Sequence, residues 1–383
     1  MSDQRLVARK PDYIIFVLVT ALSLFGLIMV FSASYYTYAV KAGASGISVL
    51  LKQGWMVVIG LVLMIITMNI PYHLYNRFRV KGFSIVAVLA VLASVVLLMI
   101  VLILPGDLNG AKRWINIFGV SIQPSEIGRF AMIFFVADEF SRKRADLTQR
   151  RDFIRFAKAF APSLFVAGGI CALILAGSNL SMTAATGLTF ICMCVAAGIN
   201  WRFIALMCFG ALALGTLFTI TESYRMARVL IFTDPFSDPQ GNGYQVVQSL
   251  YALGAGGLTG VGIGNSTQKY LYLTYGDSDF IFAIIGEETG FIGIILLLAV
   301  YALLIYRGLR CAAFTVDTDG LLLATGIIST IAIQLIINVA VCTSSMPPTG
   351  LPLPFISAGG AAMIIFMVET GILLNVSRFS RQT

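Results

Sequence analysis

The chain has 383 residues, of which 58% are hydrophobic and 11% are charged, and its formal net charge is +8. A soluble protein would carry about a quarter charged residues, so this composition excludes a soluble globular protein and indicates a polytopic membrane protein. Lys and Arg gather between apolar runs. We therefore attribute the positive charge to membrane topology and anionic lipid, and not to nucleic-acid binding.

Apolar runs predict an all-α fold of ten transmembrane helices. A helix needs about 20 apolar residues to cross the hydrocarbon core, and runs of that order recur along the chain. The fourth and the last carry ionisable residues, and the uncharged interval 159–200 is long enough for two helices that turn at Gly177–Asn179. In chain order the predicted spans are Tyr13–Ser34, Gln53–Asn69, Phe83–Pro105, Ile127–Phe140, two helices within 159–200, Phe203–Thr221, Phe280–Tyr306, Gly320–Ser345 and Ala358–Val376.

The distribution of Lys and Arg orients the chain, because cytoplasmic loops carry the excess of basic residues. With ten spans both termini lie on one side, and the loops of that side hold 18 of the 26 basic residues. We therefore place both termini in the cytoplasm, with a tail of residues 1–12, a single membrane domain of residues 13–376 and a tail of residues 377–383. The loop of residues 222–278, between the seventh and eighth helices, then lies outside.

This outer loop is far longer than usual connections, and long loops of this kind tend to be functional. Within it, Tyr244–Leu253 has the apolar period of a helix that packs on the membrane face. The glycine-rich stretch Gly256–Asn265 follows no strand, so we expect its glycines to allow close backbone packing and not to bind a nucleotide.

A proline-rich segment, Pro347–Gly360, precedes the last span. It predicts a broken, rigid backbone at membrane depth, which must line a cavity or be covered by protein.

Asp279 stands where the outer loop meets the eighth span. An aspartate at this position can simply cap the helix and suit its dipole. Alternatively, the carboxylate is functional and reaches both a lipid headgroup and solvent. The basic residues Arg225, Arg228 and Lys269 of the same loop favour this alternative, because they suit an anionic headgroup.

Charged residues also lie within the predicted spans, where ionisable groups are costly and are usually paired or functional. Glu126 and Arg129 stand i,i+3 on one helix face. We interpret them as a tether between helices or as part of a substrate path, with Glu369 as a further partner of Arg129. Glu287 and Glu288 lie about 12 Å into the eighth span, and at most one of them faces a given partner because adjacent side chains diverge.

Motifs along nearly the whole chain resemble the SEDS family (shape, elongation, division and sporulation proteins: FtsW, RodA and SpoVE). The stretches at 264–269 and 280–288 are more similar to FtsW or SpoVE than to RodA. In chain order the matching motifs are Gly110–Ile115 with Gln123–Glu126, Tyr224–Arg228 with Asp234–Phe236, Gly243–Gln245 with Gln248–Leu250, Gly262–Ser266, Asp279–Phe282 with Glu287–Gly290, and Leu353–Ser357.

The resemblance implies a peptidoglycan glycosyltransferase that polymerises lipid II at the outer face of the bacterial cytoplasmic membrane, in cell division or sporulation. The family's essential aspartate matches Asp279, which would be the general base of an inverting glycosyl transfer from an undecaprenyl-pyrophosphate-linked donor. The outer-side cations that could bind the diphosphate are Lys112, Arg113, Arg225, Arg228 and Lys269.

A divalent metal, Mg²⁺ or Mn²⁺, is compatible with this chemistry, and no organic cofactor is implied. The expected partners are lipid II, a class B penicillin-binding protein transpeptidase and other divisome proteins. Two alternatives remain: a lipid II flippase, with Glu126, Arg129 and Glu287 along the translocation path, and a non-catalytic scaffold of the cell-wall synthesis complex. The outer position of Asp279 favours the enzyme.

Overall fold

The computed structural model of the protein describes residues 10–41, 46–76, 78–80, 82–104, 113–117, 120–148, 152–221 and 223–380. Within these residues nine helices are long and apolar enough to cross a membrane. They are α1 (Tyr13–Lys41), α2 (Gly46–Asn69), α3 (Ile85–Ile103), α6 (Phe153–Ala176), α7 (Leu180–Ala197), α8 (Trp201–Ile220), α11 (Ile281–Ala313), α12 (Thr318–Cys342) and α13 (Gly360–Ser377).

A tenth helix, α4 (Pro124–Arg142), has the same 19-residue length as α3 but carries charged residues and is buried along nearly its whole length. Together the ten helices confirm the expected all-α polytopic fold. Helices α6 and α7 meet at residues 177–179, as predicted. Helix α6 begins at Phe153, earlier than the apolar run, because Asp152 caps it by accepting a hydrogen bond from the Arg155 backbone N–H.

The remaining elements are short. Two small antiparallel pairs flank α3, one at each end, and the second pair, in which Ile115 lies opposite Ile122, leads directly into α4. These elements are η1 (Tyr72–Asn76), β1 (Arg79–Val80) paired with β2 (Phe83–Ser84), β3 (Ile115–Ile117) paired with β4 (Val120–Ile122), α5 (Arg144–Thr148), α9 (Ser223–Thr233), η2 (Pro235–Ser237) and α10 (Tyr244–Gly256).

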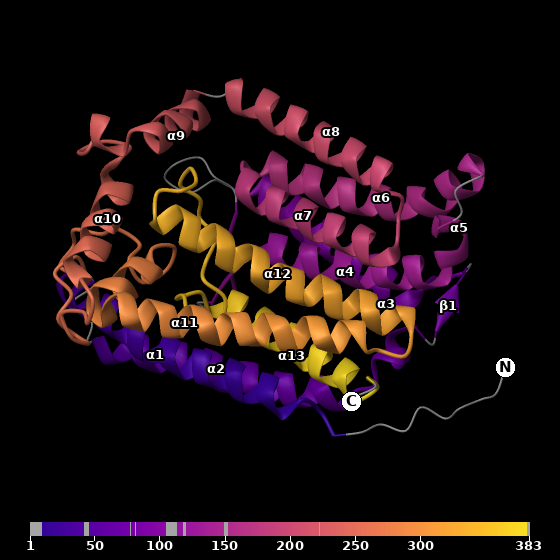
Figure 1. The fold of residues 1–383 in the computed structure, drawn as a ribbon, viewed down its shortest axis with the longest axis horizontal. Helices are drawn as coiled ribbons and strands as arrows, with labels where there is room; N and C mark the ends of the chain where they lie inside the picture. The colour runs from indigo at the N-terminus through magenta and orange to yellow at the C-terminus, as the bar shows by residue number, and fades with distance from the viewer. Residues whose placement is uncertain are drawn as a thin grey trace.

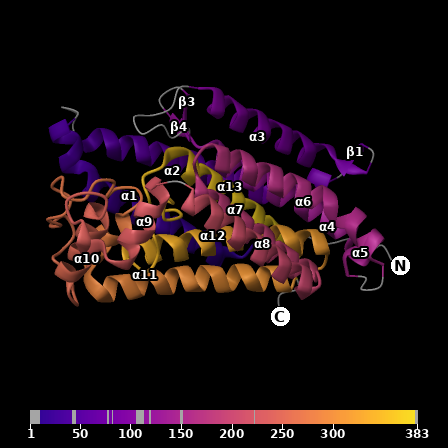
Figure 2. The ribbon, with the colours of Figure 1, turned by 90° about the horizontal axis from the view of Figure 1, so that it is seen from above.

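The long helices run roughly along one axis of the molecule (Figure 1). Helices α12 and α13 form the centre of the bundle. Among the nine apolar helices they have the largest share of buried residues, 67% and 72% over an 18-residue stretch of each helix. Figure 2 shows α3 and α11 on opposite sides of the bundle. Helix α8 lies at the periphery and contributes no fully buried residue, although Phe203, Ile204 and Met207 pack partly buried against the core.

Both ends of the described chain lie at one end of the bundle. The Asp12 backbone N–H donates a hydrogen bond of 2.9 Å to Ser377 Oγ, and Asp12 also forms an ion pair of 2.6 Å with Arg307. These contacts agree with an even number of spans. Residues 1–9 and 381–383 of the predicted tails lie outside the described residues.

The opposite end of the bundle, here called the loop end, carries α9, α10 and the residues that lead to α11 (Figure 1). Helix α10 confirms the helix expected over Tyr244–Leu253, and it packs against α11. Helix α9 was not predicted. Its basic residues interrupt the apolar pattern on which the prediction of spans relied.

Helix α11 is broken at Gly290, which has a φ of 69°. The glycine-rich stretch supplies the missing partners: Val261 N–H donates to the Glu287 carbonyl at 3.0 Å, and Phe291 N–H donates to the Gly257 carbonyl at 2.9 Å. A Cβ atom at Gly260 would lie 2.2 Å from the Glu288 carbonyl oxygen. The close backbone packing expected of these glycines is therefore confirmed, and it satisfies the backbone groups freed by the break.

Candidate active site

Asp279 lies at the loop end, two residues before α11 begins at Ile281, and its side chain is half-buried. The backbone of Gly350 borders the carboxylate, because a Cβ atom there would lie 3.3 Å from Asp279 Oδ2. Phe280, which takes the N-cap position of α11, makes no capping hydrogen bond with its side chain. Asp279 therefore stands at the junction of loop and span that the sequence predicts.

The backbone around Asp279 is held by side chains from two other segments. Asn338 Nδ2, from α12, donates a hydrogen bond of 2.8 Å to the Asp279 carbonyl oxygen. Ser357 Oγ donates to the Ser278 carbonyl at 2.7 Å, and the Ala358 N–H donates to the Asp277 carbonyl at 2.9 Å. Three consecutive carbonyls are thus fixed by partners distant in sequence, so Asp279 has a defined position.

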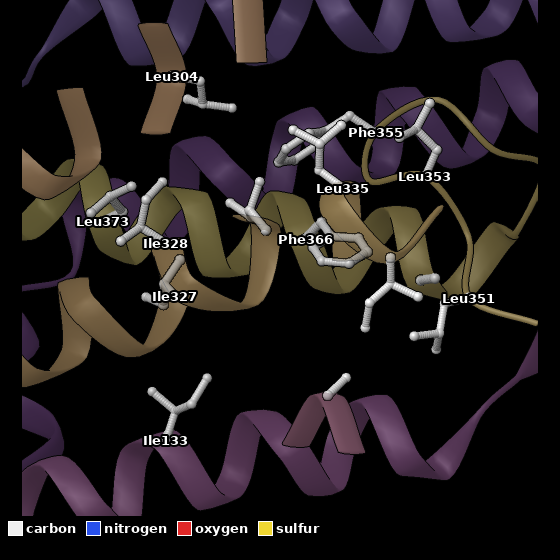
Figure 3. Close-up of a cluster of buried hydrophobic side chains, with 14 of the residues drawn as sticks. Ile133, Leu304, Ile327, Ile328, Leu335, Leu351, Leu353, Phe355, Phe366 and Leu373 are labelled. Carbon is white, nitrogen blue, oxygen red and sulfur yellow. The ribbon is translucent and has the colours of Figure 1, made fainter. Parts of the chain in front are cut away.

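The proline-rich segment comprises residues 347–359, because Gly360 already belongs to α13, and it lies against this turn. Residues 351–357 are buried, and Figure 3 shows Leu351, Leu353 and Phe355 among the side chains of the core. The Phe355 ring lies 5.7 Å from that of Phe366 on α13, and the Tyr301 hydroxyl donates to the Pro354 carbonyl. The broken backbone predicted before the last span is therefore present and is covered by protein.

Two guanidinium groups act on the Asp279 carboxylate. The pKa of Asp279 is raised from 3.8 to about 6: burial is the largest cause and the negative charge of Asp277 adds to it, whereas the charges of Arg113 and Arg228 lower the pKa. Arg228 Nη1 donates a hydrogen bond of 2.8 Å to the Pro348 carbonyl, which ties α9 to the proline-rich segment. Arg113 donates to the Ser178 carbonyl in the turn between α6 and α7.

The other predicted cations lie elsewhere. Arg225 donates a hydrogen bond of 2.9 Å to the Phe218 carbonyl and so joins α9 to the end of α8. Lys269 is buried, and its ammonium group lies 3.5 Å from Glu288 Oε1, in a cluster separate from Asp279. Lys112 lies outside the described residues. The structure thus brings Arg113 and Arg228 towards Asp279 but does not bring Lys269 or Arg225 there.

Glu126, Arg129 and Glu369 form a separate, fully buried cluster. Arg129 Nη2 lies 2.6 Å from Glu126 Oε2 and 3.5 Å from Glu369 Oε1, and all three side chains have 0% exposure. Gln334 Nε2 on α12 donates to Glu126 Oε1 at 3.2 Å. The cluster connects α4, α12 and α13, as a tether between helices requires, and Glu369 is the partner of Arg129 that the sequence suggests.

Sequence reasoning missed Gln334 and Asn338, although a signal for both was present. They are amide side chains four residues apart in a helix that is otherwise mostly apolar. Polar groups at such positions usually bind across helices, because hydrocarbon offers them no partner. Gln334 joins the buried charge cluster, and Asn338 joins the Asp279 turn.

A divalent metal can be tested against the side chains at this site. The part of the chain that the structure describes contains no group of three or more His, Cys, Asp or Glu side chains placed to hold a metal ion. Mg²⁺, however, is often held by one or two carboxylates together with substrate phosphates. The negative charge of Asp277 acts on the pKa of Asp279. These two carboxylates therefore fit a Mg²⁺ site in which substrate phosphates supply further ligands.

The fold and the site define a polytopic membrane protein that holds one carboxylate near two guanidinium groups at the end of a ten-helix bundle. The chain belongs to the SEDS family: the family model FTSW_RODA_SPOVE, described as cell cycle protein, matches residues 12–382. This match confirms the resemblance seen in the motifs.

Two named relatives match over their whole length. The probable peptidoglycan glycosyltransferase FtsW of Trichlorobacter lovleyi is 36% identical over 380 residues, covering 97% of this chain and 96% of that protein. Stage V sporulation protein E of Bacillus subtilis is 37% identical over 376 residues, covering 97% of this chain and 98% of that protein.

Solved structures agree with the fold. A chain from a peptidoglycan synthase complex, described as coordinating polymerization and crosslinking, superposes with a TM-score of 0.76 at 23% identity, covering 97% of this chain and 99% of that chain. The crystal structure of the Thermus thermophilus rod shape determining protein RodA gives a TM-score of 0.68 at 22% identity, covering 97% and 98%.

Proposed function

We propose that this protein is a peptidoglycan glycosyltransferase that polymerises lipid II into glycan strands during cell division or sporulation. The observation that carries the proposal is Asp279, a carboxylate fixed through its own backbone at the loop end, with Arg113 and Arg228 acting on it. The name probable peptidoglycan glycosyltransferase, given to a relative that matches over 96% of its own length, supports the assignment.

The proposed reaction needs one base. The 4-hydroxyl oxygen of one lipid II attacks the anomeric carbon of a strand linked to undecaprenyl pyrophosphate, and Asp279 accepts the hydroxyl proton. As the new C–O bond forms, the bond between the anomeric carbon and the diphosphate oxygen breaks, and its electron pair leaves with the diphosphate. Attack opposite the leaving group inverts the configuration. The diphosphate leaves as an anion, so a second carboxyl group is not required as an acid.

The surroundings of Asp279 suit a base. A general base works best when its pKa lies near the operating pH, and the pKa of Asp279 is raised to about 6, with burial as the largest cause. The carboxylate is then ionised at neutral pH and is still more basic than an exposed aspartate. Asn338 and Ser357 hold the surrounding carbonyls, so they fix the backbone without neutralising the side chain.

Arg113 and Arg228 are proposed to bind the diphosphate, because guanidinium groups pair with phosphate oxygens and stabilise charge that develops on a leaving group. Lys112, which lies outside the described residues, remains a candidate for the same role, whereas Arg225 binds the end of α8 instead. Lys269 is assigned a structural role, since Glu288 binds its ammonium group. A divalent metal held by Asp279, Asp277 and the diphosphate would supply further neutralisation of the leaving group.

The proposal places the protein in the bacterial cytoplasmic membrane, with both termini in the cytoplasm and the loop end outside. The excess of basic residues around the termini supports this orientation. We also propose that it works with a class B penicillin-binding protein transpeptidase and other divisome proteins. The similar fold of a chain from a peptidoglycan synthase complex is in keeping with such a partnership.

The direct test is to incubate the purified protein with fluorescent lipid II, with and without Mg²⁺ or Mn²⁺ and with and without its transpeptidase partner. Glycan strands resolved on a gel are expected from the wild-type protein and not from Asp279→Asn. A folded wild-type protein that makes no strands under any of these conditions would overturn the proposal. Lipid II translocation in vesicles that depends on Glu126 and Arg129 would instead indicate a flippase, and neither activity would indicate a scaffold.

A further inference from the structure

Glu287 and Glu288 lie at the end of a short helical segment that begins directly after the Asp279 turn. This segment, residues 281–289, is the part of α11 that precedes the break at Gly290, and residues 281–288 are buried. Negative charge at the C-terminal end of a helix is unfavourable, because the carbonyls there already carry partial negative charge. The two carboxylates must therefore be held by strong partners.

Glu287 binds three consecutive residues of the outer loop. Its Oε1 accepts hydrogen bonds from the Thr267 backbone N–H at 2.8 Å and from Thr267 Oγ1 at 2.7 Å. Its Oε2 accepts from the Ser266 hydroxyl and, at 3.4 Å, from the Gln268 backbone N–H. We call this set of contacts the Glu287 clamp. The carboxylate is fully buried, so each bond is formed away from water and its loss is costly.

Glu288 binds the same turn from the other side. Its Oε1 accepts from Ser32 Oγ on α1 at 2.6 Å and lies 3.5 Å from Lys269 Nζ. Lys269 in turn donates to the Gly264 carbonyl and, at 3.4 Å, to Ser32 Oγ. Glu288 Oε1 also accepts a hydrogen bond of 3.4 Å from the Ser266 backbone N–H. Because Ser32 belongs to α1, this second cluster attaches the turn to α1 as well as to α11.

The Glu287 clamp closes a loop on itself. Thr267 and Glu287 are 20 residues apart, and Asp277 and Asp279 lie between them. One end of this loop is the clamped turn and the other is the rigid helical segment 281–289. The Glu287 side chain binds the turn at one end of this loop, and the Glu287 backbone belongs to the helical segment at the other end. The clamp therefore limits how far the turn that carries Asp279 can move.

We propose that Glu287 is a positioning residue for Asp279: it sets the position of the base by closing the 267–287 loop and does not contact the substrate. This inference rests on the proposed glycosyltransferase function. Displacement of a catalytic group by about 1 Å can lower a rate by about 10²-fold. Loss of the clamp should therefore lower kcat and leave KM for lipid II nearly unchanged.

Glu287→Ala and Glu287→Gln separate a positioning role from a catalytic one. Glutamine keeps the carbonyl oxygen that accepts both bonds from Thr267, and the Ser266 hydroxyl can rotate to accept from the new amide. Of the four bonds, only the bond of 3.4 Å from the Gln268 N–H loses its acceptor. We expect Glu287→Ala to lower kcat by about 10- to 100-fold and Glu287→Gln to retain most of the activity. An amide should not rescue a general base, so Asp279→Asn should be as inactive as Asp279→Ala.

The matched control is Asp238→Ala. The Asp238 carboxylate lies in the same outer loop and also accepts two backbone N–H bonds, from Gly241 at 3.0 Å and from Asn242 at 2.9 Å. These bonds close a turn of only three or four residues that does not contain Asp279. Asp238→Ala should therefore leave kcat, KM and the pH profile as in the wild type.

Amide hydrogen exchange separates a local effect from a general loss of stability. In Glu287→Ala, exchange over residues 270–280 should become faster than in the wild type, while exchange in the helices distant from the clamp remains unchanged. In Asp238→Ala, exchange over residues 270–280 should remain unchanged. A general loss of stability would instead speed exchange in all parts of the chain that exchange only by global unfolding.

Unchanged hydrogen exchange over residues 270–280 in folded Glu287→Ala would overturn the inference, as would equal loss of activity in Glu287→Gln and Glu287→Ala. If Glu287→Ala does not fold, Ser266→Ala combined with Thr267→Val removes the side-chain donors and keeps the carboxylate. The same exchange measurement then decides, with smaller changes expected. If hydrogen exchange is faster in the variant but the wild-type protein forms no glycan strands, the proposed function is refuted while the inferred role of the Glu287 clamp in fixing the turn stands.

Discussion

Asn338 uses both hydrogens of its side-chain amide to join two segments that are distant in sequence. Nδ2 donates to the Asp279 carbonyl at 2.8 Å and to the Leu351 carbonyl at 2.9 Å. One buried amide on α12 therefore connects the turn that carries Asp279 to the proline-rich segment. A hydrophobic side chain at this position would leave the Leu351 carbonyl without this donor and the Asp279 carbonyl with only the long contact of 3.9 Å from Cys342 Sγ.

Asn338→Leu should lower both stability and activity. Each buried carbonyl left unpaired costs about 1–3 kcal/mol, so we expect a lower thermal midpoint in detergent and a lower kcat for strand formation. Thr325→Val is the control, because the Thr325 hydroxyl on the same helix bonds only to the Leu321 carbonyl of its own turn. If Asn338→Leu behaves like Thr325→Val in both measurements, Asn338 does not hold the site.

Asp279→Asn should abolish polymerisation in a folded protein. Asparagine preserves the size of the side chain but cannot accept a proton at neutral pH, and loss of a general base costs about 10²–10⁴-fold in rate. Asp277→Asn should be tolerated far better, since we assign proton transfer to Asp279 alone. Gel analysis of strands from purified variants measures both, and near wild-type polymerisation by Asp279→Asn would remove this residue from the mechanism.

The pH dependence of kcat/KM should follow the ionisation of Asp279. Its pKa is raised to about 6, so the base is protonated and inactive at lower pH. Activity should be constant above about pH 7 and fall about tenfold per unit well below pH 6. The negative charge of Asp277 contributes to the raised pKa, so Asp277→Asn should move the acid limb to lower pH. An upward shift in that variant would contradict the assignment.

Glu126 and Arg129 should show coupled effects on stability. Their ion pair of 2.6 Å is fully buried, and removal of one partner from such a pair costs about 3–5 kcal/mol, since Arg129, within the described residues, then keeps only the longer ion pair of 3.5 Å with Glu369. Glu126→Ala should lower the thermal midpoint strongly, whereas the double variant Glu126→Ala, Arg129→Met should recover part of the loss. Strictly additive effects in this double-mutant cycle would show that the pair contributes no interaction energy.

Co-purification with the cognate class B penicillin-binding protein should raise the polymerisation rate above that of the isolated chain. We expect the contact to involve lipid-facing parts of α11 and α12 or the outer loop. Exposed apolar side chains such as Phe291 and Leu296 make α11 a suitable surface. Full activity of the isolated chain, with no complex surviving mild detergent, would reject this coupling and leave the enzymatic assignment intact.

The sequence by itself determined the number of spans, the shared side of the termini and the position of Asp279 at a junction of loop and helix. These features depend on local composition: a run of about 20 apolar residues must cross the membrane as a helix. For the same reason, local composition predicts the conformational freedom of the glycine-rich stretch and the rigidity of the prolines before the last span.

Only the tertiary structure decided which charges meet. Lys269 and Arg228 belong to one loop and look equivalent in sequence, yet Lys269 is buried against Glu288, whereas Arg228 acts on Asp279. Partners such as Asn338 and Asp279 are 59 residues apart, and such pairs depend on how helices pack and where α11 breaks. Side-chain pairing across helices depends on the packing of the whole bundle, and no local pattern of residues encodes it.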